Sequence, residues 1–168
     1  AVISGLQVSR VEVYVLNRTN NTQTIRNFAA FMDLGEGEVI FQGGNPFVGN
    51  GNATTPTSND ANNLFQNLRS DPNLRKSDQI STILETQHGL EKGQDFVRVT
   101  GARKLDPSEY TFNPQLGYVS LSRQLQNDEV LAVSFEYNLN GRRYKVGELT
   151  EDYQNQLEED VIFLKMLR

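Results

Sequence analysis

The first regular pattern in the chain is an alternation of apolar and polar residues over Val8–Leu16. Val11, Val13 and Val15 fall on one side of it, and a two-residue repeat rich in β-branched side chains is typical of a half-buried strand. The polar segment 17–22 that follows predicts a turn.

The next apolar run, Ile25–Leu34, fits two periods. A helix would place Ile25, Phe28, Ala29 and Met32 in one stripe. A strand would place Phe28, Ala30, Met32 and Leu34 on one face. We favour the strand, because the run is short, ends at Asp33-Leu34-Gly35 and would give the first strand a neighbour. Val39–Phe41 is another short apolar run.

Residues 42–60 are rich in Gly, Pro, Asn, Thr and Ser, which predicts a long loop of the kind that often carries binding residues. Two short amphipathic helices are expected within 60–88. The first is capped by Asp60, carries Leu64, Phe65 and Leu68, and ends before Pro72. The second is capped by Ser77 or Asp78, carries Ile80, Ile83, Leu84 and Gln87, and ends at Gly89.

The dipeptide Asn140-Gly141 lies between two apolar runs, which is the strongest short signal for a two-residue type I′ hairpin. Counting outward from this turn pairs Leu139 with Arg142 and Asn138 with Arg143. It also places the pairs Tyr137/Tyr144 and Phe135/Val146 on one face and Glu136/Lys145 on the other. Both faces agree with one register, and a slip of one residue would break both.

A second hairpin is predicted around Asn113–Gly117, because Pro114 favours a turn and Gly117 accepts a positive φ. Its register pairs Phe112 with Val119 and Tyr110 with Leu121. The remaining expectations are a strand over Phe96–Val99, a bend at Asp106-Pro107, and a loop or short helix from Thr150. The apolar stretch Val161–Arg168 fits a strand or a helix, and we favour a final strand.

Together these elements predict an α+β fold, with an antiparallel, sandwich-like β-sheet and two or three short helices. The expected order is a strand-rich part (1–41), a loop (42–60), a helical part (60–88) and a second strand-rich part (94–168). The ends of the chain are more apolar than the frayed ends of most domains. We therefore expect 1–168 to be a single soluble domain of a much larger chain.

Composition narrows the possible chemistry. The 168 residues contain no cysteine, which excludes disulfides, thiolate metal sites and cysteine nucleophiles, and one histidine, which excludes a multi-histidine metal centre within the chain. The net charge of −5 argues against nucleic acid as a partner. No apolar run approaches the ~18–20 residues of a membrane-spanning helix, so direct membrane insertion of this segment is not expected.

Few residues suggest a site. His88 could be a general base, but it lies at an expected helix end and no Gly-x-Ser-x-Gly nucleophile motif accompanies it. Asp33, Glu36 and Glu38 are weak candidates for a Ca²⁺ site. A hard cation needs about six or more oxygens, so a solvent-exposed acidic turn is the favoured interpretation. We expect no catalytic residues, no metal and no cofactor.

Other polar groups are weaker candidates still. The acidic residues Glu151, Asp152, Glu158, Glu159 and Asp160 could supply an acid–base pair, but their polar surroundings predict a solvated face. The glycines at 43, 44, 49 and 51 are not followed by the lysine of a phosphate loop. A faint nucleic-acid pattern comes from Arg98, Arg103, Lys104 and Arg123. Sequons begin at Asn17, Asn20 and Asn52, and a sugar site could use Tyr14, Tyr118 or Tyr153.

Several longer strings carry a family resemblance. They are Val11–Arg18, Arg26-Asn27 leading into Ala30–Glu36, Ala102–Leu105, Glu109–Tyr118, Asp128–Val133 and Tyr144–Glu148. Together they resemble a soluble segment of the SprA/Sov-type proteins, the very large outer-membrane translocons of the Bacteroidota type IX secretion and gliding-motility system. The long string Glu109–Tyr118 is specific, whereas the Gly- and Asn-rich loop 42–60 is not.

This resemblance implies a non-enzymatic structural or interaction domain at the outer membrane or cell surface. The implied partners are other secretion-system proteins, secreted cargo and the rest of the parent chain. No site residue is transferred from the family. The alternative is an independent cell-surface module for glycan binding or adhesion, which would use residues 42–60 and Tyr118. A hydrolase with two carboxylates is disfavoured, because no such pair is visible in the sequence.

Overall fold

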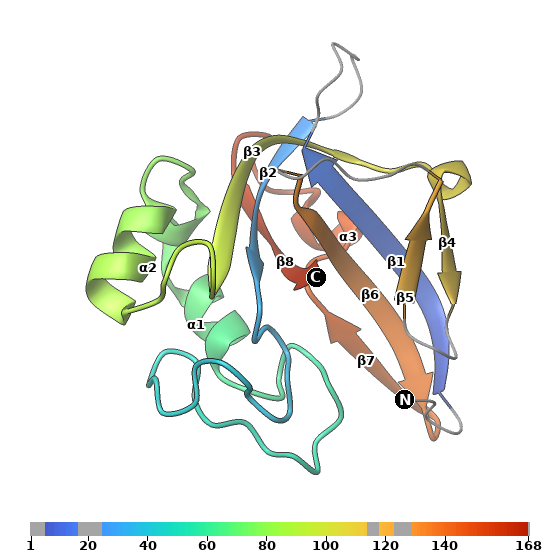
Figure 1. Ribbon diagram of the computed structural model, residues 1–168, viewed down its shortest axis with the longest axis horizontal. Coiled ribbons are helices and arrows are strands. Elements are labelled where there is room, and N and C mark those ends of the chain that lie inside the picture. The colour runs from blue at the N-terminus through green and yellow to red at the C-terminus, as the bar shows by residue number, and fades with distance from the viewer. Residues whose placement is uncertain (1–5, 17–24, 114–117, 123–128, 168) are drawn as a thin grey trace.

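The computed structural model describes residues 6–16, 25–113, 118–122 and 129–167, and Figure 1 shows its architecture. The strands are β1 (Leu6–Leu16), β2 (Ile25–Phe31), β3 (Phe96–Lys104), β4 (Tyr110–Asn113), β5 (Tyr118–Leu121), β6 (Leu131–Leu139), β7 (Arg142–Val146) and β8 (Val161–Leu167). The α-helices are α1 (Leu64–Ser70), α2 (Ile80–His88) and α3 (Thr150–Tyr153), and the 3₁₀ turns are η1 (Pro72–Arg75) and η2 (Pro107–Glu109). The described part of the chain is therefore α+β, mostly strands with three short α-helices.

The main sheet closes on itself. Its strands follow the order β1-β3-β2-β8-β6, and β6 pairs again with β1. The other edge of β6 pairs with β8 over Leu131–Val133 and with β7 over Phe135–Leu139. The expected sandwich is not clearly present, because β1 has a partner on both edges and the sheet is barrel-like. The strand pairs of the described main sheet are antiparallel, as expected, with one exception: β2 and β8 run parallel.

The described residues form three apolar clusters, and one of them fills the interior of this barrel. All five strands contribute to it, and Tyr153 of α3 joins from one end. Alanines at 30, 102 and 132 lie among larger residues such as Tyr14 and Phe28. A barrel of few strands has a narrow interior, so small side chains must alternate with large ones for its walls to meet.

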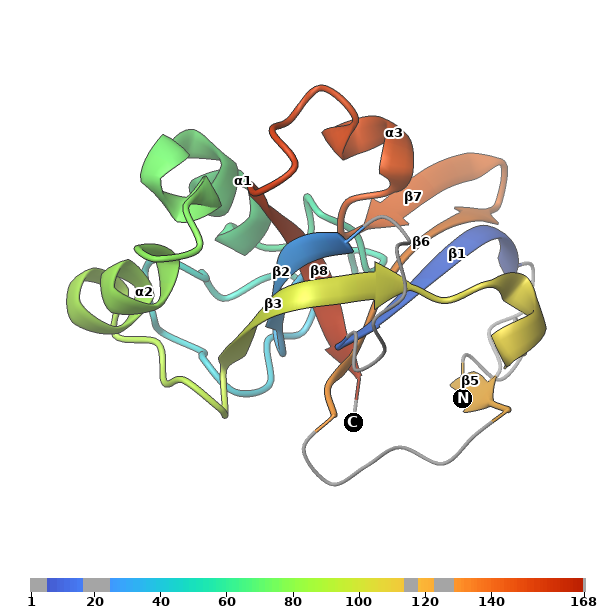
Figure 2. The same cartoon turned by 90° about the horizontal axis from the view of Figure 1, so that it is seen from above.

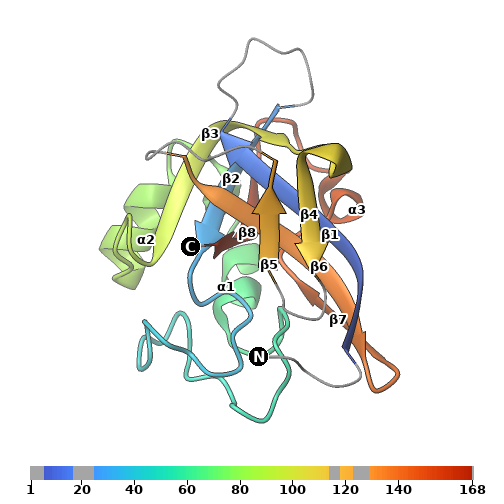
Figure 3. The same ribbon diagram turned by 45° about the vertical axis from the view of Figure 1, so that its right-hand side comes forward.

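Two further clusters lie outside the barrel. The elements that carry them, the helices and the β4–β5 sheet, lie on opposite sides of the barrel (Figure 1). On one side α1, α2, η1 and part of the loop after β2 pack against Phe31, Phe96 and Phe163. On the other side the separate β4–β5 sheet lies across β1 and β6, as Figure 3 shows. Val13 and Val15 are fully buried there. The alternating strand predicted at Val8–Leu16 is thus confirmed, and its valine face lies outside the barrel.

The predicted hairpins are confirmed in register. β6 and β7 pair as counted from the turn, and Asn140 and Gly141 have the positive φ angles, 51° and 79°, that a type I′ turn requires. β4 and β5 place Phe112 opposite Val119 and Tyr110 opposite Leu121. The predicted turn residues of that second hairpin, 114–117, lie outside the described residues.

The two runs that fitted either a strand or a helix are strands, over Ile25–Phe31 and Val161–Leu167. The segment after β7 begins with the short helix α3, one of the two structures expected there.

The predicted helix caps are wrong. α1 begins at Leu64, whose N–H donates to the side chain of Asn62, and α2 begins at Ile80 with no side-chain cap. Asp60 instead accepts a hydrogen bond from Gln66. The predicted end at Gly89 is confirmed, with φ 68°.

Candidate functional site

The three acidic residues named as weak metal candidates do not converge. Asp33 is only 3% exposed, contrary to the expected solvated turn, and its carboxylate accepts backbone N–H groups of residues 40–42 at 2.8–3.4 Å. Glu36 pairs with Lys165 at 2.7 Å, and Glu38 is exposed. Among the described residues no three potential ligand side chains come together. Asp33 therefore fixes the start of the long loop.

His88 has a structural role at the end of α2. Its ring stacks on Phe47, with the ring centres 3.7 Å apart and the planes 20° from parallel. Its carbonyl accepts a hydrogen bond from Asn45 at 2.8 Å. Partial burial lowers the pKa of His88 below its ordinary value, because the charged imidazolium is poorly solvated there. The residue joins the long loop to α2.

The acidic and basic candidate residues do not come together in one site, because most of them pair with other residues in different parts of the molecule. Glu151 pairs with Arg10 and Asp152 with Lys145, while Glu158 and Glu159 are exposed. Arg98 donates to the carbonyl of Ser77, Arg103 pairs with Glu109, and Lys104 contacts Thr150. Arg123 lies outside the described residues. The described candidates therefore form neither an acid–base pair nor one basic surface.

The sugar-site candidates are separated in the same way. Tyr14 and Tyr153 are 0% and 8% exposed, so neither ring is available as a flat contact for a sugar. The side chain of Tyr118 and the sequons at Asn17 and Asn20 lie outside the described side chains. Asn52 is exposed, and its side-chain oxygen accepts hydrogen bonds from Thr54.

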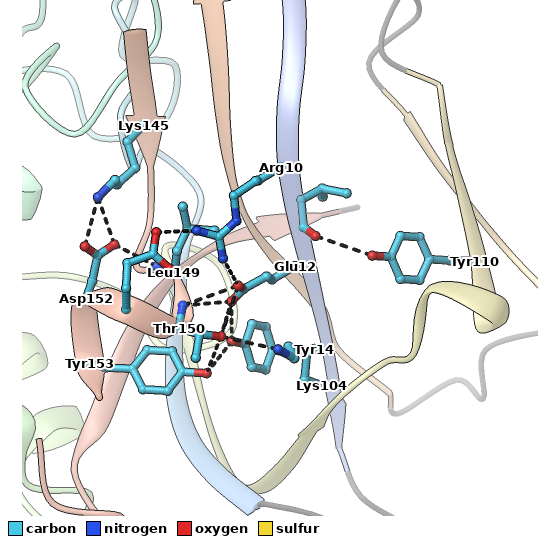
Figure 4. Close-up of polar contacts among 12 residues, drawn as sticks. Arg10, Glu12, Tyr14, Lys104, Tyr110, Lys145, Leu149, Thr150, Asp152 and Tyr153 are labelled. Carbon is cyan, nitrogen blue, oxygen red and sulfur yellow. Dashed lines mark hydrogen bonds and ion pairs between the residues drawn. The ribbon is translucent and has the colours of Figure 1, made fainter. Parts of the chain in front are cut away.

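The most concentrated polar cluster surrounds Glu12 of β1, at the end of the barrel beside α3 (Figure 4). Glu12 is only 6% exposed. Its carboxylate accepts hydrogen bonds from Arg10 at 2.7 Å, from the hydroxyl of Tyr14 at 2.9 Å, and from both the N–H and the hydroxyl of Thr150 at 3.0 Å. The Tyr14 and Tyr153 hydroxyls are 2.7 Å apart. Glu12 therefore joins the barrel to the first turn of α3.

The Glu12 cluster is a poor centre for acid–base chemistry. Both carboxylate oxygens already accept hydrogen bonds. Burial, and then the negative charge of Glu12, raise the pKa of Tyr14 far above its ordinary value, so its proton is firmly held. Neither Glu12 nor Tyr14 lines either of two large hollows on the surface. The cluster acts as a structural joint.

The larger hollow, which we call the apolar groove, has a volume of about 670 Å³. Val11, Val133 and Phe135 of β1 and β6 form its floor, and Phe112 and Val119 of the β4–β5 sheet form one wall. The other wall is the loop after β2, with Ile40 and residues 53–57. The groove thus lies over the outer face of the β1–β6 pair, between two segments that are distant in sequence.

The loop wall is held in place by contacts to the sheet. Tyr137 of β6 donates a hydrogen bond to the carbonyl of Thr57, and burial raises the pKa of this tyrosine to about 12. Lys165 of β8 donates to the carbonyl of Met32 and pairs with Glu36. The side chain of Ile40 is nevertheless 68% exposed at the rim of the groove. Such an open apolar surface is typical of an interaction site.

A second hollow of about 640 Å³ lies between α1, β7 and α3, and we call it the arginine groove. Its basic side chains are Arg69, Arg75, Arg142, Arg143 and Lys145. Two of them are neutralised within the groove. Arg75 binds the buried Glu148 through two hydrogen bonds of 2.6 and 2.8 Å, and Lys145 pairs with Asp152 at 2.8 Å.

Sequence reasoning missed both grooves and the Glu12 cluster. The apolar pairs Phe112/Val119 and Phe135/Val146 were predicted correctly as the faces of two hairpins. Nothing in the local pattern indicated that these faces meet across β1. Glu12 lies between Val11 and Val13, and the alternating pattern of this strand would place it on the solvent side. Its burial was therefore not predicted from the pattern.

Searches for known relatives identify none: no family model matches the chain, and no curated protein matches it. Within the described residues no helix is long and apolar enough to cross a membrane.

Proposed function

We propose that this chain is a non-enzymatic interaction domain that binds a polypeptide segment in the apolar groove, as part of an outer-membrane translocon of the SprA/Sov type. The observation that carries the proposal is the groove itself. It is an open hollow of about 670 Å³ whose floor consists of aliphatic and aromatic side chains. A groove of this size and lining suits a few apolar side chains of a partner.

The strings that carry the family resemblance support the same surface. Five of them contribute a residue to the lining of the apolar groove, although they come from five separate parts of the chain. The residues are Val11, Glu36, Phe112, Val133 and Val146. The partners would be secretion-system proteins, secreted cargo or the parent chain, at the outer membrane or cell surface.

The non-enzymatic character is supported by the state of the titratable groups. The buried carboxylates Asp33, Glu12 and Glu148 all accept hydrogen bonds from donors within the chain. A general acid or base needs a pKa near the working pH and access to a substrate. The carboxylates of these three residues therefore have hydrogen-bond partners within the chain.

The first test is the sequence of the complete gene. A translocon of this type requires flanking regions with many segments of about ten alternating residues, as in transmembrane β-barrels. Flanks without such segments would remove the translocon from the proposal.

The second test is a pair of matched variants in the full-length protein in its own bacterium. Ile40→Asp places a charge at the rim of the apolar groove, and Leu157→Asp makes the same change at a side chain of similar exposure, 63%, that does not line the groove. We expect the first to reduce secretion and gliding while the second does not, at equal protein levels. Equal behaviour of the two strains would contradict the role of the groove.

A further inference from the structure

We infer that the arginine groove receives an acidic, extended stretch of the same polypeptide partner that occupies the apolar groove. This inference rests on the proposed function and adds the chemistry of the partner: apolar side chains at one end of the bound segment and carboxylates at the other.

The charge of the arginine groove is the first observation. The chain carries a net charge of −5, yet this groove is lined by five basic side chains and three acidic ones, Asp60, Glu148 and Asp152. Arg75 and Lys145 are neutralised by Glu148 and Asp152. Arg69 and Arg142 have no acidic partner among the described residues. Arg143 is 75% exposed and pairs with Glu136, which does not line the groove.

Guanidinium groups favour a carboxylate ligand. Arginine presents a planar set of N–H donors that matches the two oxygens of a carboxylate, and its charge is present at every relevant pH. Arg69 also lies over the ring of Phe65, 5.7 Å from its centre, which keeps its side chain at the groove. A row of such groups is complementary to a run of Asp or Glu side chains.

The edge of β7 is the second observation, and it favours an extended peptide. The carbonyl of Lys145 points away from β6 and accepts a hydrogen bond from the N–H of Asn59 at 2.7 Å. In an antiparallel strand every second residue directs its N–H and C=O to the same side, so those of Arg143 also face outward. Within the described residues nothing pairs with them. An extended chain could bind there by β-strand addition.

The position of the two grooves is the third observation. Thr55 lines both, and β7 contributes Val146 to the apolar groove and Arg142 and Arg143 to the arginine groove. The turn between β6 and β7 projects from the body of the molecule (Figure 3). Arg142 and Arg143 beside this turn are exposed, whereas Asn59 covers the strand edge at Lys145. One segment can therefore contact both hollows as it passes along β7.

The test measures binding of fluorescent synthetic peptides to the purified chain by anisotropy at low and high salt. The probe has alternating valines followed by a run of glutamates, and the comparison peptides carry lysines or serines in place of the glutamates. We expect the glutamate peptide to bind at least about tenfold more tightly than the lysine peptide, with the difference reduced at high salt.

Variants then locate the effect. Arg142→Gln with Arg143→Gln, both at exposed positions, should weaken the glutamate peptide by about tenfold and leave the serine peptide unchanged. Lys92→Gln removes one exposed positive charge outside the groove and should change neither. Unchanged melting temperatures would show that the variants fold.

Three outcomes would overturn the inference. Equal binding of the glutamate, serine and lysine peptides would be consistent with binding in the apolar groove, but it would reject the acidic stretch proposed for the partner. Arginine-dependent binding of polygalacturonate without binding of the glutamate peptide would assign the groove to an acidic polysaccharide. Failure of all three peptides to bind would reject both this inference and the peptide-binding role of the apolar groove.

Discussion

At the scale of single residues, the chain uses buried charges as joints between segments distant in sequence. Glu12 accepts the N–H of Thr150, which is 138 residues away. Glu148 holds Arg75 and also accepts the N–H of Phe163, while Arg75 donates to the carbonyl of Val161 and lies over the ring of Phe163. A buried charge is costly unless its partners are all present, so each joint depends on one arrangement of strands and helices.

The Glu12 joint leads to a stability prediction. Glu12→Gln keeps the size of the side chain but turns an NH₂ group toward N–H and O–H donors, which leaves donors unsatisfied in a buried site. We expect the free energy of unfolding to fall by about 2–4 kcal/mol, measured by urea denaturation. The matched change Glu158→Gln, at an exposed position, should have an effect within about 0.5 kcal/mol.

The single histidine makes a pH prediction possible. Burial lowers the pKa of His88 below 6.5, so the folded chain favours the neutral ring. As the pH falls below about 6.5, the unfolded chain takes up a proton first, and the free energy of unfolding decreases until the folded pKa is reached. Urea denaturation between about pH 7.5 and 5.5 should show this loss, and His88→Gln should reduce it. An unchanged slope in the variant would contradict the assignment.

At the scale of elements, the local sequence determines which residues of two strands pair wherever a tight turn connects those strands. The β6–β7 hairpin follows from Asn140-Gly141 alone, because a two-residue turn with positive φ at both positions sets the register of both strands. The helix caps behave differently. The starts of α1 and α2 are set by packing of Leu64 and Ile80 into the apolar cluster under the helices, and the expected cap residues were not needed.

The turn can be tested by substitution. At Gly141 a Cβ atom would meet nothing within 4 Å, so Gly141→Val isolates the backbone cost of φ 79° for a β-branched residue. We expect a loss of about 1–3 kcal/mol in the free energy of unfolding. Gly43 also has open space but no positive φ, so Gly43→Val is the matched control and should stay within about 0.5 kcal/mol. Equal losses for the two variants would argue against the type I′ turn.

At the scale of the whole molecule, a narrow closed barrel carries two unequal layers on its outside. The helical side packs Phe31, Phe96, Phe65 and Phe163 around one cluster, with ring centres 6.3–6.5 Å apart in three pairs. On the opposite side β4 and β5 form a sheet of two strands. Among the described residues this sheet contacts the barrel through apolar side chains and through the Tyr110 hydroxyl, which donates to the carbonyl of Val11. α3 lies next to β7 at the barrel end, as Figure 2 shows.

The contrast between the closed barrel and the separate β4–β5 sheet predicts different rates of amide hydrogen exchange in the two. β2 and β8 each have a neighbouring strand on both sides in the closed sheet. Their amides should therefore exchange only through global unfolding. Amides of β4 and β5 should exchange through smaller local openings, because a two-stranded sheet is weakly stable by itself. Exchange measured by mass spectrometry under native conditions should therefore label β4–β5 well before β2 and β8. Similar protection of the two regions would mean that the small sheet unfolds together with the barrel.

The sequence by itself determined the α+β class, the strand at Val8–Leu16, both hairpin registers and the helix end at Gly89. Each of these depends on residues within about ten positions of one another, through turn geometry and side-chain period. Closure of the sheet, the parallel β2–β8 pair, the Glu12 joint and both grooves were decided only by the tertiary structure. Their contacts join segments far apart in the chain, and the energy of such pairings depends on how every other element packs.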